Sequence, residues 1–355
     1  MKKRNAWLLL LTCTLYGGAA WANDLGTILG GRSDQFKKAL PGQPITLPAD
    51  HAAHPDYRSE WWYLTGNLKD EQGREYGMQW TLFRQGIEQQ IKTNNPWLTP
   101  QLWLAQFAIT DLGKGSHQQD ERTSRQGPGL AGASGGEYWL REWVLASQGK
   151  ALFPATLKVQ SKIGELNLKV DAAKPVVLQG KQGYSEKSPG NASFYYSYPR
   201  LTLTGTLTLD GEARKVTGQG WFDHEWSSSV LADWQSGWDW FSLQLSDGRE
   251  LMLFRLRTKA GRANPENRYG ILIERDGSSR VLSPESIVLT PGKTWRGPKG
   301  QDYPVQWQLK AGDLKLRIKA RQPNQAMTGR FDYWEGAVTI SGDAKGLGYL
   351  EMTGY

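Results

Sequence analysis

GWFDHEW at positions 220–226 and GWDWF at positions 237–241 are the two runs of sequence that decide how this chain folds. They set carboxylates, aromatic rings and one of the chain's four histidines side by side, without the three-to-four-residue spacing of a helix. In an extended strand, successive side chains point to opposite faces. The first run therefore predicts a strand that carries Phe222, His224 and Trp226 on one face.

The second run leads to an expectation about a single carboxyl group. Asp239 shares its face with Phe241, whereas Trp238 points to the other side. Because the apolar face of a strand is expected to face the core, Asp239 is predicted to point inward among hydrocarbon side chains. Burial there would raise the pKa of its carboxyl group, and a neighbouring cation would instead hold it ionised. The sequence leaves both outcomes open.

Short alternating runs of this kind recur along the chain, and helical periodicity is almost absent after residue 40. Asp-Gly pairs at 210–211, 247–248 and 276–277 favour tight hairpin turns, because these residues tolerate positive φ. The runs span residues 61–68, 77–84, 102–109, 166–170, 201–209, 238–245, 250–257, 271–274, 305–309, 314–318 and 337–341. Many short strands joined by hairpins predict an all-β fold, either an antiparallel sandwich or an antiparallel barrel.

A faint internal repeat indicates two related β domains. Residues 61–84 and 238–255 both read as an aromatic first strand, a turn ending Gly-Arg-Glu and a strand ending Leu-Phe-Arg. The repeat places the joint around residues 227–236. We therefore expect a first β domain over 51–228 and a second over 229–355, with an N-terminal segment at 23–50.

The first 22 residues have the character of a secretory signal peptide: a basic start, a short apolar run and an Ala-x-Ala exit ending at Ala22. This predicts export to the periplasm. The only cysteine, Cys13, lies in this leader, and a lipid anchor on it is the alternative to ordinary cleavage. Cleavage leaves a chain with no thiol for disulfides or metal binding. A short amphipathic helix from Asp24 to Leu40 is expected next.

Composition excludes several classes of function. The net charge is +8 at pH 7, but the lysines and arginines are scattered, so a nucleic-acid partner is not expected. No stretch after the leader is apolar enough for a membrane helix. His51, His54 and Asp56 could ligate a metal on a helix, yet Pro55 argues against a continuing helix. We therefore interpret this motif as a polar linker and expect neither metal nor cofactor.

Several segments resemble the carotenoid hydratase (hydroxyneurosporene synthase) family, whose exported relatives are described as secreted hydrolases or lipocalin-like proteins. They are Ser59–Tyr63, Tyr196–Leu201, Trp221–Trp226 and Tyr333–Tyr355. The resemblance spans nearly the whole chain beyond the leader. It implies two tandem lipocalin-like antiparallel β-barrels. The named hydratases of the family add water across a terminal C=C of an acyclic carotenoid, whereas many exported relatives have no established substrate.

The resemblance also points to the His-x-Trp pair His224 and Trp226, and to the strand start Trp238-Asp239. Alkene hydration needs an acid, an aromatic face to stabilise a carbocation and a base for the attacking water. This assigns Asp239 as the acid, Trp226 or alternatively Trp238 as the cation stabiliser, and His224 as the base or as a residue that orients the water. Gly237 stands where an aromatic residue is expected, which leaves catalysis open.

Three functions remain possible at this stage. The first is an exported carrier that binds a lipid or isoprenoid at or near the joint of the barrels, with an envelope transport system as a possible partner. The second is a hydratase or hydrolase acting on such a molecule, and the third is a structural envelope protein. The expected ligand-binding residues are Trp238, Phe222, Phe241, Glu60 and Trp62.

Overall fold

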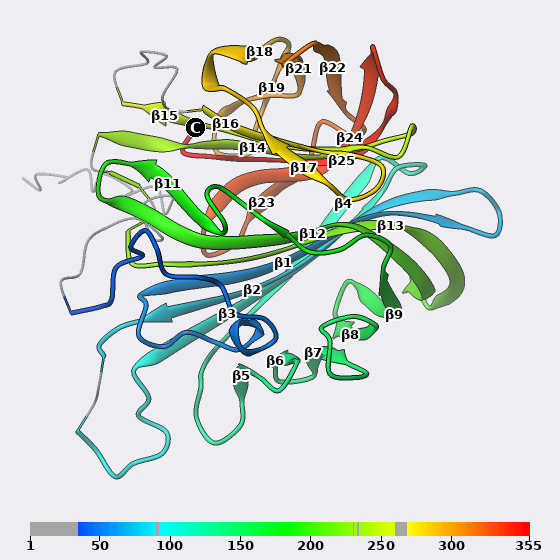
Figure 1. Cartoon of the computed structure of the whole chain (residues 1–355). Coiled ribbons are helices and arrows are strands. Elements are labelled where there is room, and N and C mark those ends of the chain that lie inside the picture. The colour runs from blue at the N-terminus through cyan, green and yellow to red at the C-terminus, as the bar shows by residue number, and fades with distance from the viewer. Residues whose placement is uncertain (1–34, 90–91, 230, 233, 260–267) are drawn as a thin grey trace, which may run out of the picture.

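The computed structural model describes residues 35–89, 92–229, 231–232, 234–259 and 268–355. In these residues the fold is almost entirely antiparallel β structure, arranged as two large sheets (Figure 1). The described helices are two short 3-10 turns, η1 (Ala49–His51) and η3 (Pro284–Ser286). Neither of them is long or apolar enough to cross a membrane.

The first sheet has thirteen strands and curls into a nearly closed barrel. Its hydrogen-bonded order is β4-β3-β2-β1-β13-β12-β9-β8-β7-β6-β5, with β10 and β11 added along β12. The strands are β1 (Ser59–Asp70), β2 (Glu75–Gly86), β3 (Gln101–Asp111), β4 (Ser116–Arg125), β5 (Ala131–Ser134), β6 (Glu137–Leu140), β7 (Trp143–Ser147), β8 (Ala155–Ser161), β9 (Gly164–Ala172), β10 (Val177–Leu178), β11 (Tyr184–Ser188), β12 (Asn191–Leu209) and β13 (Glu212–Ser227).

The second sheet has ten strands and forms a half-barrel in the order β17-β16-β15-β14-β25-β24-β22-β21-β18, with β23 beside β24. A separate pair is formed by β19 and β20. The strands are β14 (Gln235–Leu245), β15 (Glu250–Thr258), β16 (Arg268–Ile273), β17 (Ser279–Val281), β18 (Ile287–Pro291), β19 (Thr294–Arg296), β20 (Asp302–Pro304), β21 (Gln306–Ala311), β22 (Leu314–Ala320), β23 (Ala326–Thr328), β24 (Asp332–Gly342) and β25 (Gly346–Thr353).

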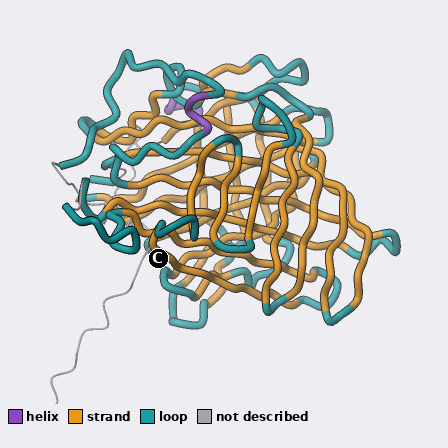
Figure 2. Tube along the Cα trace, turned by 90° about the horizontal axis from the view of Figure 1, so that it is seen from below, coloured by secondary structure: helices purple, strands orange, loops and turns teal. Residues whose placement is uncertain are grey.

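The two sheets pack against each other through their outer faces, as the crossing strands in Figures 1 and 2 show. Strands β1, β2 and β12 contact β25, β24 and β14, respectively. Each barrel keeps its own core on its inner face, and two further apolar clusters fill the joint. As a result, residues 220–227 of β13 are buried on both sides.

The all-β prediction is confirmed, and every predicted run overlaps a strand. The Asp210-Gly211 pair forms the β12–β13 hairpin turn with φ of 54° and 77°. The helix expected over 24–40 lies mostly outside the described residues, and its described part, 35–40, is a turn followed by irregular chain. There the Lys37 N–H donates to Asp56 O, so this backbone is tied to a loop and not to a helix.

The joint also buries a pair of acidic side chains from the second sheet, Glu335 and Glu351, which lie opposite each other on β24 and β25. Burial, together with the charge of Glu351, raises the pKa of Glu335 well above its usual value. The folded protein therefore holds a proton on Glu335 at pH values where the unfolded chain releases it. The stability linked to this proton is present at low pH and is lost as pH rises above the unfolded pKa.

We predict that Glu335→Gln stabilises the protein progressively as pH rises from 5 to 8, with a slope of up to about 1.4 kcal/mol per pH unit relative to wild type. Urea unfolding at several pH values measures this difference. Glu285→Gln, at an exposed position on η3, is the control and is expected to follow wild type. Identical pH dependence in Glu335→Gln and wild type would contradict the assignment.

Candidate functional site

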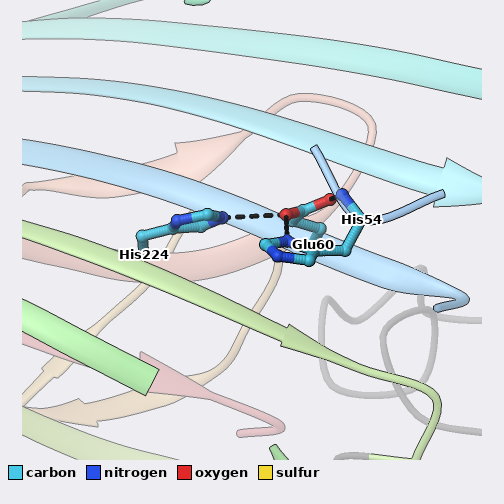
Figure 3. A group of neighbouring side chains, drawn as sticks. All are labelled: His54, Glu60 and His224. Atoms are coloured by element: carbon cyan, nitrogen blue, oxygen red, sulfur yellow. Dashed lines mark hydrogen bonds and ion pairs between the residues drawn. The ribbon is translucent and has the colours of Figure 1, made fainter. Parts of the chain in front are cut away.

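Inside the first barrel, Glu60 at the start of β1 is the centre of a buried polar cluster (Figure 3). Its Oε1 atom lies 2.7 Å from Nδ1 of His54 and 2.8 Å from Nε2 of His224. Its Oε2 atom accepts hydrogen bonds from Arg84 Nε and from the His54 backbone N–H, both at 2.8 Å. The carboxylate is therefore shared among two imidazoles and one guanidinium group.

Aromatic rings enclose this cluster. The His54 ring stacks on Trp226 with centroids 3.9 Å apart, and the His224 ring stacks on Trp62 at 4.7 Å. The Tyr196 hydroxyl lies between Nδ1 of His224 (2.9 Å) and Nδ1 of His51 (2.7 Å). Both nitrogens of His224 are thus engaged by protein groups.

The ionisable groups of the cluster differ in their pKa values and therefore in their charge at neutral pH. Burial lowers the pKa of His224 to about 4 despite the nearby Glu60. Burial also opposes protonation of His54, but the charges and hydrogen bonds of Glu60 and Asp50 raise its pKa to about 9. Burial alone would raise the pKa of Glu60, yet Arg84 and His54 hold it well below its usual value. At neutral pH the cluster therefore contains a cationic His54, an anionic Glu60 and a neutral His224.

The structure brings five of the sequence-predicted site residues together and separates the other three. Glu60, Trp62, Phe222, His224 and Trp226 lie on the inner face of the first barrel. Phe241 is in the core of the second barrel, Asp239 points to that same side, and Trp238 lies in the joint. Because side chains alternate between the two faces of β13 and β14, His224 points into the first barrel and Asp239 points into the second. The expected acid and base are therefore not brought into one cavity.

Asp239 is instead tied into an ion-pair network of the second barrel. Its Oδ2 lies 2.7 Å from Nη2 of Arg255, and its Oδ1 accepts hydrogen bonds from Arg257 Nη1 (2.5 Å) and from the Tyr355 hydroxyl (2.7 Å). The carboxylate is completely buried. Of the two outcomes that the sequence left open, the structure shows the neighbouring cations. This geometry is that of a structural anchor joining β14 to β15 and the C-terminal residue.

We predict that Asp239→Asn lowers the free energy of unfolding by about 3 kcal/mol, because it leaves two partly buried guanidinium groups without their fully buried anion. Chemical denaturation measures this loss. The matched control is Asp247→Asn, which breaks a half-exposed pair with Arg249 and is expected to cost less than about 1 kcal/mol. Equal small losses in both variants would show that Asp239 is not an anchor.

Among the hollows in the joint between the barrels, two have walls rich in aromatic and apolar side chains. The larger is a cleft of about 560 Å³ between the ends of β2, β3 and β4 and the chain before β24. Its wall is mostly apolar and includes Phe83, Ile87, Leu102, Trp103, Leu104 and Phe331. Arg125 and Arg330 also line it, and both are exposed. Its volume falls in the range of small-molecule sites.

The smaller hollow is a pocket of about 50 Å³ that combines aromatic walls with charged groups. Its apolar wall includes Trp61, Tyr63, Tyr195, Trp238, Trp240 and Phe254, and its charged residues are Lys187, Asp223, Glu225 and Glu351. The two hollows border on one apolar cluster, in which the rings of Tyr63 and Phe83 are 5.6 Å apart. The pocket has room for a few waters or for one end of a ligand.

Asp223 is the titratable group of this pocket best suited to proton transfer. Burial raises the pKa of its carboxyl group to about 7, although Ser197 and Tyr195 donate hydrogen bonds to its Oδ1 at 2.5 and 2.9 Å. The neighbouring Glu225 is paired with Lys187 at 3.2 Å. A carboxyl group that titrates near neutrality beside aromatic faces can serve as an acid or a base.

The sequence analysis did not identify every residue of the cluster around Glu60 or of the pocket that contains Asp223. The alternation in the opening run already set Asp223 and Glu225 opposite His224, but the apolar inner face was taken as the site. No sequence pattern identified Lys187 as a site residue, because it reaches the pocket only through the pairing of β11 with β12. His54 was set aside because of Pro55, yet it reaches Glu60 from a loop and needs no helix.

The fold defines a lipocalin-like double β-barrel protein. A family model described as AttH-like matches residues 38–355. The crystal structure of an AttH candidate from Nitrosomonas europaea is 33% identical and superposes with a TM-score of 0.83, covering 90% of this chain and 99% of that one. The chain belongs to the AttH-like family, in agreement with the expected hydratase-like kinship.

More distant structures share the fold alone. Kievitone hydratase from Nectria haematococca has a TM-score of 0.67 at 16% identity, with 91% of this chain and 97% of that chain covered. CghA with Sch210972 has a TM-score of 0.53 at 15% identity and the same coverage. Among curated proteins, none matches this sequence.

Proposed function

We propose that this protein binds an elongated apolar small molecule, a lipid or an isoprenoid, in the joint between its two barrels. The observation that carries the proposal is the cleft of about 560 Å³ with its largely apolar wall. Sites for small molecules usually have volumes of about 300–1,000 Å³ and walls of this kind. The arginines at the cleft, Arg125 and Arg330, suit a ligand whose end is polar or anionic.

The location proposed for this activity is the periplasm, after removal of residues 1–22. The N-terminal sequence supports export, since it has a basic start and an Ala-x-Ala exit. A carrier of apolar molecules in that compartment would exchange its ligand with an envelope transport system.

We predict that Leu102→Glu weakens binding of a fluorescent long-chain fatty acid at least tenfold. Leu102 lines the cleft and is only half-buried, so the variant is expected to fold, while a charge in the apolar wall opposes an acyl chain. Fluorescence titration measures the affinity. Val288→Glu, at a 40% exposed apolar position on β18, is the control and should bind as wild type does. Equal affinities in all three proteins would refute the location.

A hydratase-type reaction is the second candidate, and the pocket beside the cleft favours it. Asp223 would give its proton to one carbon of a C=C, which forms a C–H bond and leaves a carbocation next to the faces of Trp238 and Trp240. Water would then bond to the cation, and its released proton would return to the Asp223 carboxylate. The products balance as alkene plus water giving alcohol. Kievitone hydratase, which shares the fold, is named for a hydration.

This candidate predicts slow incorporation of ¹⁸O from labelled water into an isoprenoid alkene, detected by mass spectrometry of the alcohol. Asp223→Asn is expected to lower the rate at least 100-fold, the usual scale for removing a general acid. Asp247→Asn, on the surface turn before β15, is expected to keep the wild-type rate. Labelled product at the wild-type rate in Asp223→Asn would exclude this mechanism, and binding by Asp223→Asn would still support the carrier.

A further inference from the structure

The cluster around Glu60 has a property that neither proposed function uses: three metal-ligand atoms converge inside the first barrel. The Nδ1 atom of His54, the Oε1 atom of Glu60 and the Nε2 atom of His224 all lie within 4.8 Å of one another. Figure 3 shows both rings turning a nitrogen toward the same carboxylate oxygen. Small outward movements of these side chains would make room for an ion bonded at about 2.0–2.2 Å to each atom.

The chemistry of this donor set is selective. Two imidazoles and one carboxylate form the three-ligand set of open zinc sites, and the same set suits other divalent transition metals. Calcium and magnesium prefer oxygen ligands and fit it poorly. A fourth position would remain for water, because the other residues around the cluster are mainly aromatic.

In each of the three side chains, the polar atom that does not face the proposed ion has a hydrogen-bonding or ion-pair partner of its own. Nε2 of His54 lies 3.3 Å from Asp50 Oδ1, and Nδ1 of His224 lies 2.9 Å from the Tyr196 hydroxyl. The second oxygen of Glu60 accepts from Arg84 Nε. Metal-binding side chains are oriented in this way, because a partner on the far atom fixes the ring or carboxylate and the tautomer.

The walls of the site contain donors whose hydrogen-bonding capacity is unused. The indole N–H groups of Trp62 and Trp226 and the hydroxyl of Tyr138 are buried and have no hydrogen-bond partner among the described residues. Leaving one such group unsatisfied costs about 1–3 kcal/mol. Trp62 and Trp226 stack on the two histidines, and Tyr138 lies 5.6 Å from Trp62.

From these observations we propose that His54, Glu60 and His224 bind one divalent transition metal ion of the zinc type within the first barrel. The ion replaces the protons that the two imidazoles otherwise share with Glu60. His54 comes from the loop before β1, Glu60 from β1 and His224 from β13. Binding would therefore fix this loop over the end of the barrel, independently of any ligand in the joint.

The test is a titration of the full-length protein with Zn²⁺ and with Co²⁺. The protein is first treated with a chelator, and the chelator is then removed. Calorimetry with Zn²⁺ is expected to give one site per chain, and Co²⁺ is expected to produce the visible absorption of a low-coordinate centre. Mutation of a residue that only hydrogen-bonds to a metal ligand typically weakens metal binding by roughly 10–100-fold. His54→Gln and His224→Gln each remove a ligand itself, so each should weaken Zn²⁺ binding by more than this. The control is His117→Gln, a half-buried histidine bonded to Thr110 outside the cluster, which should bind as wild type does.

A second readout guards against variants that fail to fold. Zn²⁺ is expected to raise the unfolding temperature of wild type and of His117→Gln, but not of His54→Gln. His54 is on a loop with a partly exposed side chain, so this variant should keep a cooperative transition of its own. Absence of a one-to-one site in wild type, or unchanged Zn²⁺ affinity in a folded His54→Gln, would overturn the proposal. Loss of metal binding with normal fatty-acid binding would leave the proposed function untouched.

Discussion

The structure depends on one constraint: a wall of strands that is buried on both of its faces. Strands β1, β12 and β13 line the core of the first barrel with one set of side chains and pack against the second sheet with the other. Because the side-chain period of a strand is two, a shift of one residue would exchange the two faces completely. The register Trp62↔His224 therefore decides the contents of both sites at once.

Burial on both faces explains why the wall mixes aromatic and charged residues. A carboxylate cannot be buried there without partners, so each is supplied with cations or donors. Glu60 forms ion pairs with Arg84 and His54 on the inner face, and Glu225 forms an ion pair with Lys187 on the outer face. The same desolvation leaves Asp223, whose partners are neutral hydroxyl groups, with a pKa near neutrality. The pattern of partners thus separates anchoring carboxylates from one that can exchange a proton.

Local rules were sufficient to predict much of the fold from sequence. Period-two patterns and Asp-Gly turns gave the strands, and the alternation in residues 220–226 gave the correct faces. Long-range pairing lay beyond such rules, because the partners of Glu60 come from a loop and from a strand 164 residues away. Asp239 illustrates the same limit. Its inward direction followed from the pattern, but Arg255, Arg257 and Tyr355 had to be placed by the barrel before its role could be read.

The central claim is that apolar ligands occupy the joint and that the barrel interiors are packed cores. A crystal structure of the protein with a long-chain fatty acid brominated at mid-chain tests this directly, since anomalous scattering locates the bromine without reference to a fitted ligand. The account predicts bromine peaks in the cleft between Leu104 and Phe331. Peaks inside the first barrel, beside Trp62 or Phe222, would contradict it.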